Sequence, residues 1–577
     1  MYMGSQYDLI IRQGLIVDGN GGEPYLGDVA VKDGRIAALG TVDGSAGEEI
    51  DAKGALVTPG FIDVHTHYDG QAIWSDRMAP SSGHGVTTVV VGNCGVGFAP
   101  CRPGDRDLLI SSMEGVEDIP EIVMTEGLTW EWESFPEFLD AIDKRKHDID
   151  VAAYIPHSAL RVYVMGDRGA NREPATEDDI AKMVALVDTA MQAGAVGFAT
   201  SRMSFHRRID GEFIASFGAP EPEIHAIAKE VARHGGIFQI VPALIEVPEL
   251  ERAKEEFEFL RRLSKVCGLP VTFTTAQPDF APRRLDEIMK WVAEANKEEG
   301  VELRPQVYPR PVGMVLGWDL SANPFIECAS YKAIAGLPLA ERIAELRKPE
   351  VRDKIVHEAA GVPVLPIMTM ARHFVNMYAM GTSPNYEPAP SSSVTELARA
   401  KGVSPEEIAY DLLLEQNGDA KLMVAMGNYS DGNLDCIGSY LTQGDGVVAL
   451  GDGGAHYGLV CDASYPTFML THWARDRDHD RLGLAEVVKA MSKTPAGLAG
   501  FKDRGELAVG KKADVNIIDF DTLELHSPEV KFDLPAGGRR LDQNASGYRA
   551  TLVAGKVIQR NGSPTGELPG RLVRAGH

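Results

Sequence analysis

Two patterns of hydrophobic and polar positions divide the chain. Short alternating runs separated by glycine turns predict β-strands near the N-terminus, at 7–11, 15–17, 28–31 and 35–38. The same pattern of short β-strand runs recurs at 513–519 and 548–558. We therefore expect both ends of the chain to pair in one β-sandwich, formed by 1–58 plus 501–577.

Between residues 59 and 500, short β-branched runs alternate with amphipathic segments of helical spacing. The predicted strands lie at 61–64, 87–91, 151–155, 195–199, 237–241, 271–275, 303–308 and 447–450. Helix signals separate them, including a capping-box pattern at 176–179 and apolar residues at helical spacing from 283 to 297. Eight βα units predict an α/β fold of the (β/α)8 TIM-barrel type, with 59–500 as the catalytic domain.

One stretch of the predicted barrel, 313–446, is too long for a loop. It carries its own helix signals, such as Ser404 as an N-cap, Pro405 at the first helical position and Glu407 at the third. We expect a large lid-like insertion before the last barrel strand.

The charge and composition of the chain limit the classes of molecule that it can bind. The chain has 57 Lys and Arg against 83 Asp and Glu, a formal charge of −26, which repels nucleic acid and anionic membranes. No window approaches the roughly 20 apolar residues that span a bilayer. Residues 1–6 lack the basic start of a secretory signal, and six cysteines spread over 577 residues fit a reducing compartment. We expect a cytoplasmic protein with a small-molecule substrate, and the oligomeric state stays open, a homo-oligomer included.

Candidate chemistry begins at His65 and His67, which are separated by one residue at the end of an apolar strand. Alternate residues of a strand project to the same face, so two imidazoles can share one metal ion. In a barrel they would lie at the C-terminal mouth, where catalytic groups gather. The pattern is short and also arises by chance, but the apolar strand before it and the glycine turns around it favour a metal site.

Four segments resemble the metal-dependent amidohydrolase superfamily, and more narrowly its N-acyl-D-amino-acid deacylase (D-aminoacylase) group. They are GFIDVHTHYD at 60–69, HGVTTVVVGNCGVGF at 84–98, GDGGAH at 451–456 and GELAVGKKADV at 505–515. The resemblance implies that His65, His67, Cys94 and Asp452 bind the metal. It also implies that Asp452 is the catalytic residue that handles the proton of the attacking water.

These donors suit zinc, which takes imidazole, thiolate and carboxylate ligands and leaves one position for water. Asp452 would accept the water proton and pass it to the leaving amine. Cys94 can instead be a buried structural thiol, and Asp452 a turn residue between glycines.

The chain departs from the family pattern at strands 5 and 6, where the family places metal-binding histidines. Gln239 and Thr275 stand at about those positions, and neither side chain is a strong zinc ligand. One ion is therefore the simplest expectation, and the second site lacks its usual ligands.

Three further histidines, each following a predicted strand, can supply a ligand or an acid–base group: His206, which ranks first, His157 and His456. Each can instead be a hydrogen-bonded loop residue. The candidates for binding the substrate are Arg202, Arg310, Gln239 and Tyr308. A guanidinium can grip a carboxylate through two hydrogen bonds, although either arginine can also belong to a structural ion pair.

The resemblance implies a hydrolase of a non-peptide C–N bond, the amide of an N-acyl-D-amino acid or a related N-acyl compound. The same scaffold could cleave a cyclic amide, a urea, a carbamate or an aryl amide. A catalytically degenerate scaffold protein is the alternative from another class, but it would need none of the four predicted metal ligands.

Overall fold

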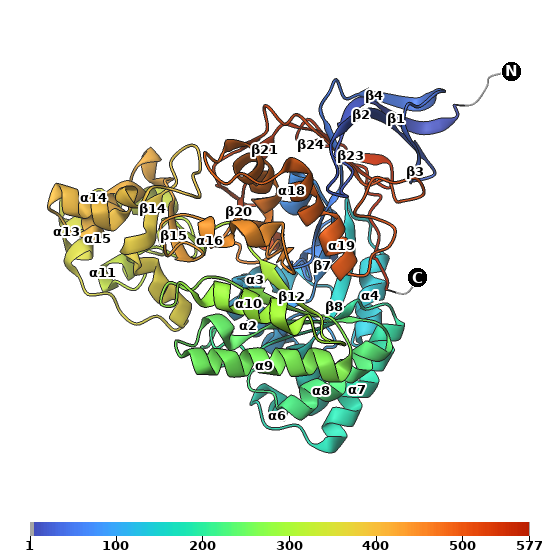
Figure 1. Ribbon diagram of the computed structural model, residues 1–577. Coiled ribbons are helices and arrows are strands. Elements are labelled where there is room, and N and C mark those ends of the chain that lie inside the picture. Colours follow the sequence, from blue (N-terminus) through green and yellow to red (C-terminus); the bar gives the residue numbers. More distant parts are fainter. Residues whose placement is uncertain (1–4, 576–577) are drawn as a thin grey trace.

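The computed structural model describes residues 5–575 and has an α/β architecture (Figure 1). Residues 1–4, part of the segment used to predict the absence of a signal, lie outside the described residues. Within 5–575, no helix has the length and apolar character needed to cross a bilayer.

A parallel sheet of eight strands forms the centre of the molecule, and its strands follow one another in the order of the sequence. The strands are β6 (Phe61–Asp63), β7 (Val86–Val91), β8 (Asp150–Pro156), β9 (Gly197–Ser201), β10 (Ile237–Val241), β11 (Val271–Thr275), β12 (Leu303–Val307) and β16 (Val447–Val448). All eight coincide with predicted strands, and the predicted α/β barrel is confirmed.

Beyond the two outermost strands, backbone hydrogen bonds join the ends of the sheet. The amide of Asp452 donates to the carbonyl of His65 at 3.2 Å, and the amide of His67 donates to the carbonyl of Gly453 at 2.8 Å. The segments that carry the candidate ligands are therefore the segments that hold the two ends of the curled sheet together.

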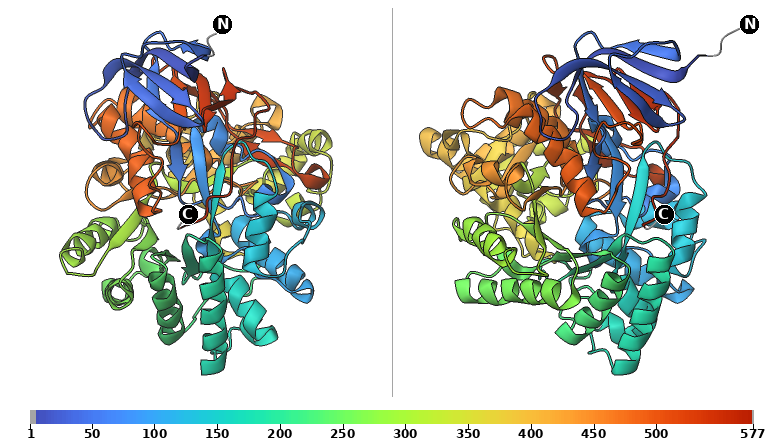
Figure 2. Two further views of the ribbon diagram at one scale, coloured as in Figure 1. Left: turned by 90° about the vertical axis from the view of Figure 1, so that its right-hand side faces the viewer. Right: turned by 45° about the vertical axis from the view of Figure 1, so that its right-hand side comes forward.

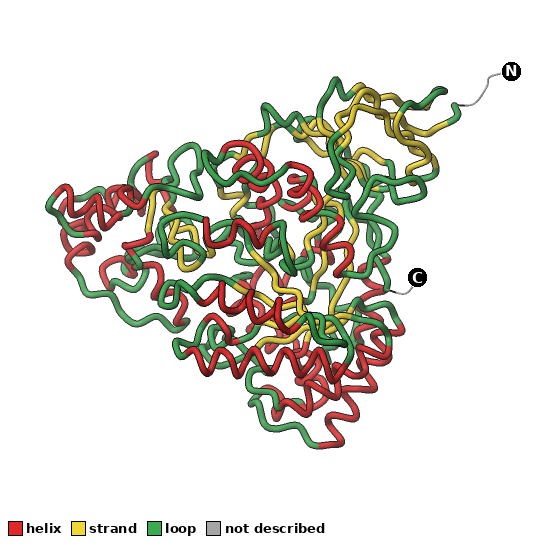
Figure 3. The backbone as a smooth tube through the Cα atoms, viewed as in Figure 1, coloured by secondary structure: helices red, strands yellow, loops and turns green. Residues whose placement is uncertain are grey.

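Long helices lie on the outside of these strands (Figure 3). Three of them, α7 (Glu177–Gln192), α8 (Glu221–Arg233) and α9 (Leu250–Cys267), line the lower edge of Figure 1. The predicted capping box starts α7, with the Thr176 side chain accepting from the Asp179 amide. The helix predicted from 283 to 297 is α10 (Arg284–Ala295).

A second sheet, of nine strands, combines both ends of the chain, whose blue and red strands lie together in Figure 2. The N-terminal strands are β1 (Tyr7–Ile16), β2 (Tyr25–Lys32), β3 (Arg35–Gly40), β4 (Ala46–Asp51) and β5 (Leu56–Pro59). The C-terminal strands are β17 (Val515–Ile518), β22 (Tyr548–Val553), β23 (Lys556–Arg560) and β24 (Ser563–Pro564). The two sets meet where β5 pairs antiparallel with β17, with Val57 opposite Ile517. The domain boundaries, 1–58 plus 501–577 and 59–500, stay a prediction.

The chain between β12 and β16 forms its own packed unit, at the left of Figure 1. A small antiparallel sheet joins β13 (Val312–Leu316), β15 (Leu422–Gly427) and β14 (Met377–Ala379). Helices α12 (Leu339–Leu346), α13 (Pro349–His357), α14 (Val394–Lys401) and α15 (Pro405–Leu413) surround it. Trp318, Phe325 and Tyr410 pack together in its core. The predicted N-cap at Ser404 is present as a full capping box with Glu407.

Candidate metal centre

His65 and His67 lie just beyond β6, which ends at Asp63, so the prediction that they stand on the strand is wrong by a few residues. The chain still runs beside the next strand, because the amide of Thr66 donates to the carbonyl of Val90 at 3.1 Å. Both imidazoles are buried at 1 % exposure. Both side chains nevertheless line one pocket, together with Cys94 and Asp452.

Four donor atoms from three segments meet at this point. The Sγ of Cys94 lies 3.3 Å from the Nε2 of His65 and 3.7 Å from the Nε2 of His67. On the other side, the Oδ1 of Asp452 lies 3.5 and 3.8 Å from the same two nitrogens. Bonds of about 2.0–2.3 Å to a tetrahedral zinc ion put donor atoms about 3.3–3.8 Å apart. The donor atoms of His65, His67 and Cys94 all lie within 4.8 Å of one another and fit such an ion, and the Asp452 carboxylate lies within the same range of both histidines.

The backbone around these donors adopts an uncommon conformation. Cys94, Asp452 and His456 have φ angles of +57°, +46° and +49°, the left-handed region that residues other than glycine rarely occupy. Such strain persists only where surrounding contacts fix it, and it concentrates at functional sites.

The two glycines that follow Asp452 allow close contact with the histidine segment. A Cβ at Gly453 would lie 2.5 Å from the Tyr68 hydroxyl, and one at Gly454, whose φ is +87°, would lie 2.7 Å from the carbonyl oxygen of His67. The loop that carries Asp452 can therefore approach His67 only with glycine at these positions.

Burial dominates the electrostatics of the site. It lowers the pKa of His65 and of His456 to about 4 and that of His206 to about 3, so that these imidazoles are neutral and available as ligands near neutral pH. Burial also raises the pKa of the Cys94 thiol and the Asp452 carboxyl well above their usual values. A cation at the site is what would stabilise their charged forms, and the Oδ1 of Asp452 has no hydrogen-bond partner.

Two glutamines hold the donors in place. The Nδ1 of His65 lies 2.7 Å from the Oε1 of Gln306, on β12. The Oε1 of Gln239, on β10, accepts from the backbone amide of Cys94 at 3.2 Å. Gln239 thus supports the cysteine loop, and its predicted contact with substrate finds no support in the structure.

The donors line a pocket of about 200 Å³. His206 and His456, two of the predicted additional histidines, and Tyr308, a predicted substrate contact, also line it. The other lining residues are Val116, Glu117, Met203, Val241, Ile245, Thr274, Thr275, Ala276, Val312, Leu450 and Asp462.

Three predicted residues have structural partners instead of a place in the pocket. His157 is fully buried, with its ring nitrogens 2.7 Å from the Thr200 hydroxyl and 2.8 Å from Glu223. Arg202 makes a two-point ion pair with Glu256, at 2.7 and 2.9 Å.

The guanidinium of Arg310 is 1 % exposed and is held by the Tyr308 hydroxyl, the carbonyl of Cys461 and the carboxylate of Asp462. Since its donors are occupied, as are those of Arg202, the predicted anchoring of a substrate carboxylate by these arginines is not supported.

Sequence reasoning missed Glu117, the last residue of α2 (Arg106–Glu117). Its carboxylate is 1 % exposed, and its Oε2 lies 3.4 Å from the Nε2 of His67. A helix terminus carries no spacing motif, and only the folded chain brings this residue to the histidines.

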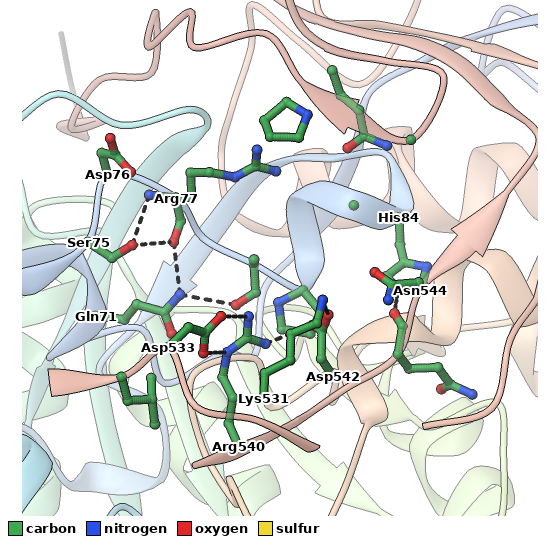
Figure 4. A pocket seen from close by; sticks show the side chains of 18 of the residues that line it. Gln71, Ser75, Asp76, Arg77, His84, Lys531, Asp533, Arg540, Asp542 and Asn544 are labelled. Atoms are coloured by element: carbon green, nitrogen blue, oxygen red, sulfur yellow. Dashed lines mark hydrogen bonds and ion pairs between the residues drawn. The ribbon is translucent and has the colours of Figure 1, made fainter. Parts of the chain in front are cut away.

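A larger pocket, of about 610 Å³, lies between residues 71–84 and the C-terminal segment 531–564 (Figure 4). Several of its charged groups pair with one another, since Arg540 pairs with Asp533 at 2.8 Å and with Asp542 at 2.7 Å. None of the donor clusters found in residues 5–575 lies in it, and the smaller pocket is the candidate site.

Comparison with known proteins agrees with this geometry. Residues 48–559 match the profile of the Amidohydrolase family, so the chain belongs to that family, and the predicted resemblance is confirmed. A D-aminoacylase of Alcaligenes xylosoxydans xylosoxydans is 30 % identical over 59 % of this chain and 66 % of its own length. An N-acyl-D-aspartate deacylase of the same organism is 34 % identical over 44 % of this chain and 46 % of its own. The matches to these two relatives thus cover less than two thirds of their length.

Solved structures share the whole fold. A crystal structure of D-aminoacylase has a TM-score of 0.66 at 22 % identity, over 98 % of this chain and 100 % of that one. An N-acyl-D-glutamate deacylase from Bordetella bronchiseptica, complexed with zinc and a phosphonate inhibitor, has a TM-score of 0.64 at 23 % identity, over 99 % and 100 %. At this identity the likeness concerns the fold.

Proposed function

We propose that the protein is a zinc-dependent hydrolase of N-acyl-D-amino acids, with one ion held by His65, His67, Cys94 and Asp452. The observation that carries the proposal is that the Cys94 Sγ and the Asp452 Oδ1 each lie 3.3 to 3.8 Å from the Nε2 atoms of the buried His65 and His67. The names of the deacylase relatives support the substrate class.

Zinc in this position would lower the pKa of a bound water and polarise the carbonyl of the amide. Asp452 is the residue placed to move the proton. Its side chain is 21 % exposed, whereas those of His65 and His67 are 2 % and 1 % exposed, so that its carboxylate borders both the donors and the open pocket. It can accept a proton from water and then donate it to the amide nitrogen, which must be protonated to leave.

The pocket limits how a substrate carboxylate can be held. No Lys or Arg is among the lining residues within the described part of the chain. Thr274 and Thr275, at the end of β11, line the pocket and have buried hydroxyls without hydrogen-bond partners. We assign the carboxylate contact to these hydroxyls, in place of Arg202 and Arg310.

The alternatives on the same scaffold, which act on cyclic amides, ureas, carbamates or aryl amides, gain no support from a particular contact. The degenerate scaffold gains none either, because all four donors are present and oriented. A cytoplasmic location is part of the proposal and rests on six cysteines that form no disulfide.

A substrate panel tests the proposal. Protein freed of metal by chelation and then reloaded with zinc should hydrolyse N-acetyl-D-amino acids, and it should cleave the L-enantiomers far more slowly. Metal-free protein should be inactive on both. Activity that is unchanged by chelation, or a reloaded protein inactive on every N-acyl-D-amino acid of the panel, would contradict the proposal.

A further inference from the structure

The larger pocket, shown in Figure 4, has no part in the proposed function. Its volume of about 610 Å³ lies within the roughly 300–1,000 Å³ of pockets that bind small molecules. One wall is formed by the segment 71–84 and the other by the C-terminal segment 531–564. Among the described residues, none that lines this pocket also lines the pocket of the metal donors. A molecule bound here would therefore be separate from the metal centre.

Arg77 lines this pocket, and its terminal nitrogens have no hydrogen-bond partner within residues 5–575. Its ion pair with the buried Asp148 is long, with 3.7 Å between the Nε of Arg77 and the Oδ2 of Asp148. In Figure 4 the Arg77 side chain extends away from the exposed Asp76 into the space between the two walls. A guanidinium carries five N–H donors in a planar fork, so the two terminal nitrogens can bind a ligand while Nε faces Asp148.

Lys531 and Arg540, the other basic residues that line the pocket, are engaged. Both pair with Asp542, and Arg540 also pairs with Asp533. The two positive charges therefore balance two negative charges of the same wall. Arg77 is the basic residue of the pocket that can offer its hydrogen bonds to a bound anion.

Two buried side chains of the pocket have donors without partners. Gln559, on β23, is 3 % exposed, and its side-chain amide forms no hydrogen bond within the described part of the chain. Trp74, which ends α1 (Gln71–Trp74), has a buried indole N–H without a partner. Buried polar groups are almost always hydrogen-bonded, so unpartnered donors that line one cavity indicate a ligand with acceptor atoms. The ring of Trp74, with Pro535 and Pro564, also offers apolar surface to such a ligand.

We propose that this pocket is a second binding site and that it takes a small organic carboxylate. Arg77 would hold the carboxylate through two parallel hydrogen bonds, and the apolar part of the ligand would pack against Trp74 and the prolines. A carboxylate only accepts hydrogen bonds, so it also suits the donors of Gln559 and Trp74. Hydrolysis of an N-acyl amino acid by water releases a carboxylic acid and an amino acid. The proposed reaction would therefore supply ligands of this class, although the site does not depend on that reaction.

Tryptophan fluorescence tests the site, because Trp74 lines this pocket and no tryptophan of the described residues lines the pocket of the metal donors. Zinc-loaded full-length protein is titrated with phenylacetate, with D-phenylalanine and with the uncharged 2-phenylethanol. We expect a saturable change in emission with phenylacetate or D-phenylalanine, and none with 2-phenylethanol at the same concentrations. The carboxylate that binds more tightly identifies the source of the ligand, a free acid or an amino acid.

Variants locate the response and assign it to Arg77. Trp74→Phe should abolish the change in emission. Arg77→Gln should weaken carboxylate binding about 10- to 100-fold, because the charge-assisted hydrogen bonds are lost. The control Arg399→Gln, at an arginine of α14 whose side chain is 79 % exposed, should bind like the wild type. Circular dichroism checks folding. Arg77→Lys keeps a charge beside Asp148 but lacks the planar fork, so it should also weaken binding and replaces Arg77→Gln if that variant fails to fold.

Three results would overturn the inference: no saturable response to either carboxylate, an equal response to 2-phenylethanol, or an unchanged affinity in the Arg77 variants. A response that persists in Trp74→Phe would also overturn it, because the ligand would then bind elsewhere. Hydrolytic activity does not enter the measurement, so each of these results leaves the proposed function as it stands.

Discussion

The Nδ1 of His65 lies 2.7 Å from the Oε1 of Gln306, a residue 241 positions further along the chain. An amide oxygen only accepts hydrogen bonds, so the imidazole carries its proton on Nδ1. The other nitrogen, Nε2, is then unprotonated and faces Cys94 and Asp452. Gln306 therefore sets the tautomer in which His65 can bind a metal.

Replacing Gln306 by Leu should weaken zinc binding about 10- to 100-fold, because the ring loses the partner that fixes its tautomer and direction. Competition with a fluorescent chelator measures the zinc affinity. The control is Gln277→Leu, since Gln277 is also a buried glutamine but bonds to Ser430 and Asn428. Equal zinc affinities for both variants and the wild type would remove Gln306 from the metal centre.

The local sequence pattern was sufficient to predict the barrel and part of the site. Most barrel strands are short runs rich in apolar and β-branched residues, such as Val86–Val91 and Val271–Thr275, and burial on both faces makes such runs visible without any tertiary information. His65 and His67 were found because two ligands stand on one segment. Glu117 was not, because its role depends on the folded path of α2, and a glutamate at a helix end has no distinguishing neighbours in the sequence.

The two arginines show a choice that the sequence left open. Arg202 and Arg310 were candidates both for a substrate contact and for a structural ion pair, and their partners Glu256 and Asp462 come from segments 54 and 152 residues further along the chain. An arginine near a predicted strand end looks the same in sequence whether it binds a ligand or a distant carboxylate. Only the three-dimensional contacts distinguish the two cases.

The contacts of Glu387 predict that the link between the insertion, 313–446, and the rest of the chain is sensitive to acid. Burial alone would raise its pKa, but hydrogen bonds from His472 at 2.6 Å and Arg477 at 2.9 Å outweigh burial and lower the pKa to about 2. A carboxyl with a lowered pKa in the folded state stabilises the protein above its unfolded pKa, here about 4.5. We expect the Glu387 carboxylate to contribute about 3 kcal/mol to the free energy of unfolding at pH 6. This contribution should be lost as the pH falls from about 4.5 to about 2.

Urea unfolding of the wild type and of Glu387→Gln at a series of pH values checks this expectation. The difference in unfolding free energy between the two should be largest near pH 6 and should shrink steadily below pH 4.5. Glu396→Gln serves as the control, since Glu396 pairs at the surface with Arg399. A difference that does not change with pH would show that the Glu387 carboxylate contributes no acid-dependent stability.

Asp150, at the start of β8, links the barrel to the C-terminal segment. Its side chain is 1 % exposed and pairs with Arg504 and with Lys512. Substitution by Ala removes the buried partner of Arg504 and one of the two buried partners of Lys512, which keeps Asp514, and should cost about 3–5 kcal/mol of unfolding free energy. Asp519→Ala, at a partly exposed pair with Arg549, should cost under about 1 kcal/mol. Chemical denaturation compares the two, and equal losses would contradict the role of Asp150.

The proposed sandwich of 1–58 plus 501–577 makes a separate prediction. Truncation after residue 500 removes β17 and leaves the adjoining edge of β5 unpaired. It also removes both basic partners of Asp150. We expect the truncated chain to aggregate, as measured by its soluble fraction and by size-exclusion chromatography. A soluble, monodisperse and active product would show that the two ends do not form one folding unit.

Asp452 is the residue on which the proposed chemistry depends most. Asp452→Asn keeps the shape of the side chain and removes its basicity, so kcat should fall by about 10²–10⁴-fold through loss of proton transfer. The KM should change little, because we assign the substrate carboxylate to Thr274 and Thr275. Measurement requires zinc-loaded protein, with bound metal quantified in each sample. Asp445→Asn, at a partly exposed pair with Arg304, is the control and should keep its kcat. A near-normal kcat in metal-loaded Asp452→Asn would assign the proton transfer to another group of the pocket, with His206 and Glu117 the next to be replaced.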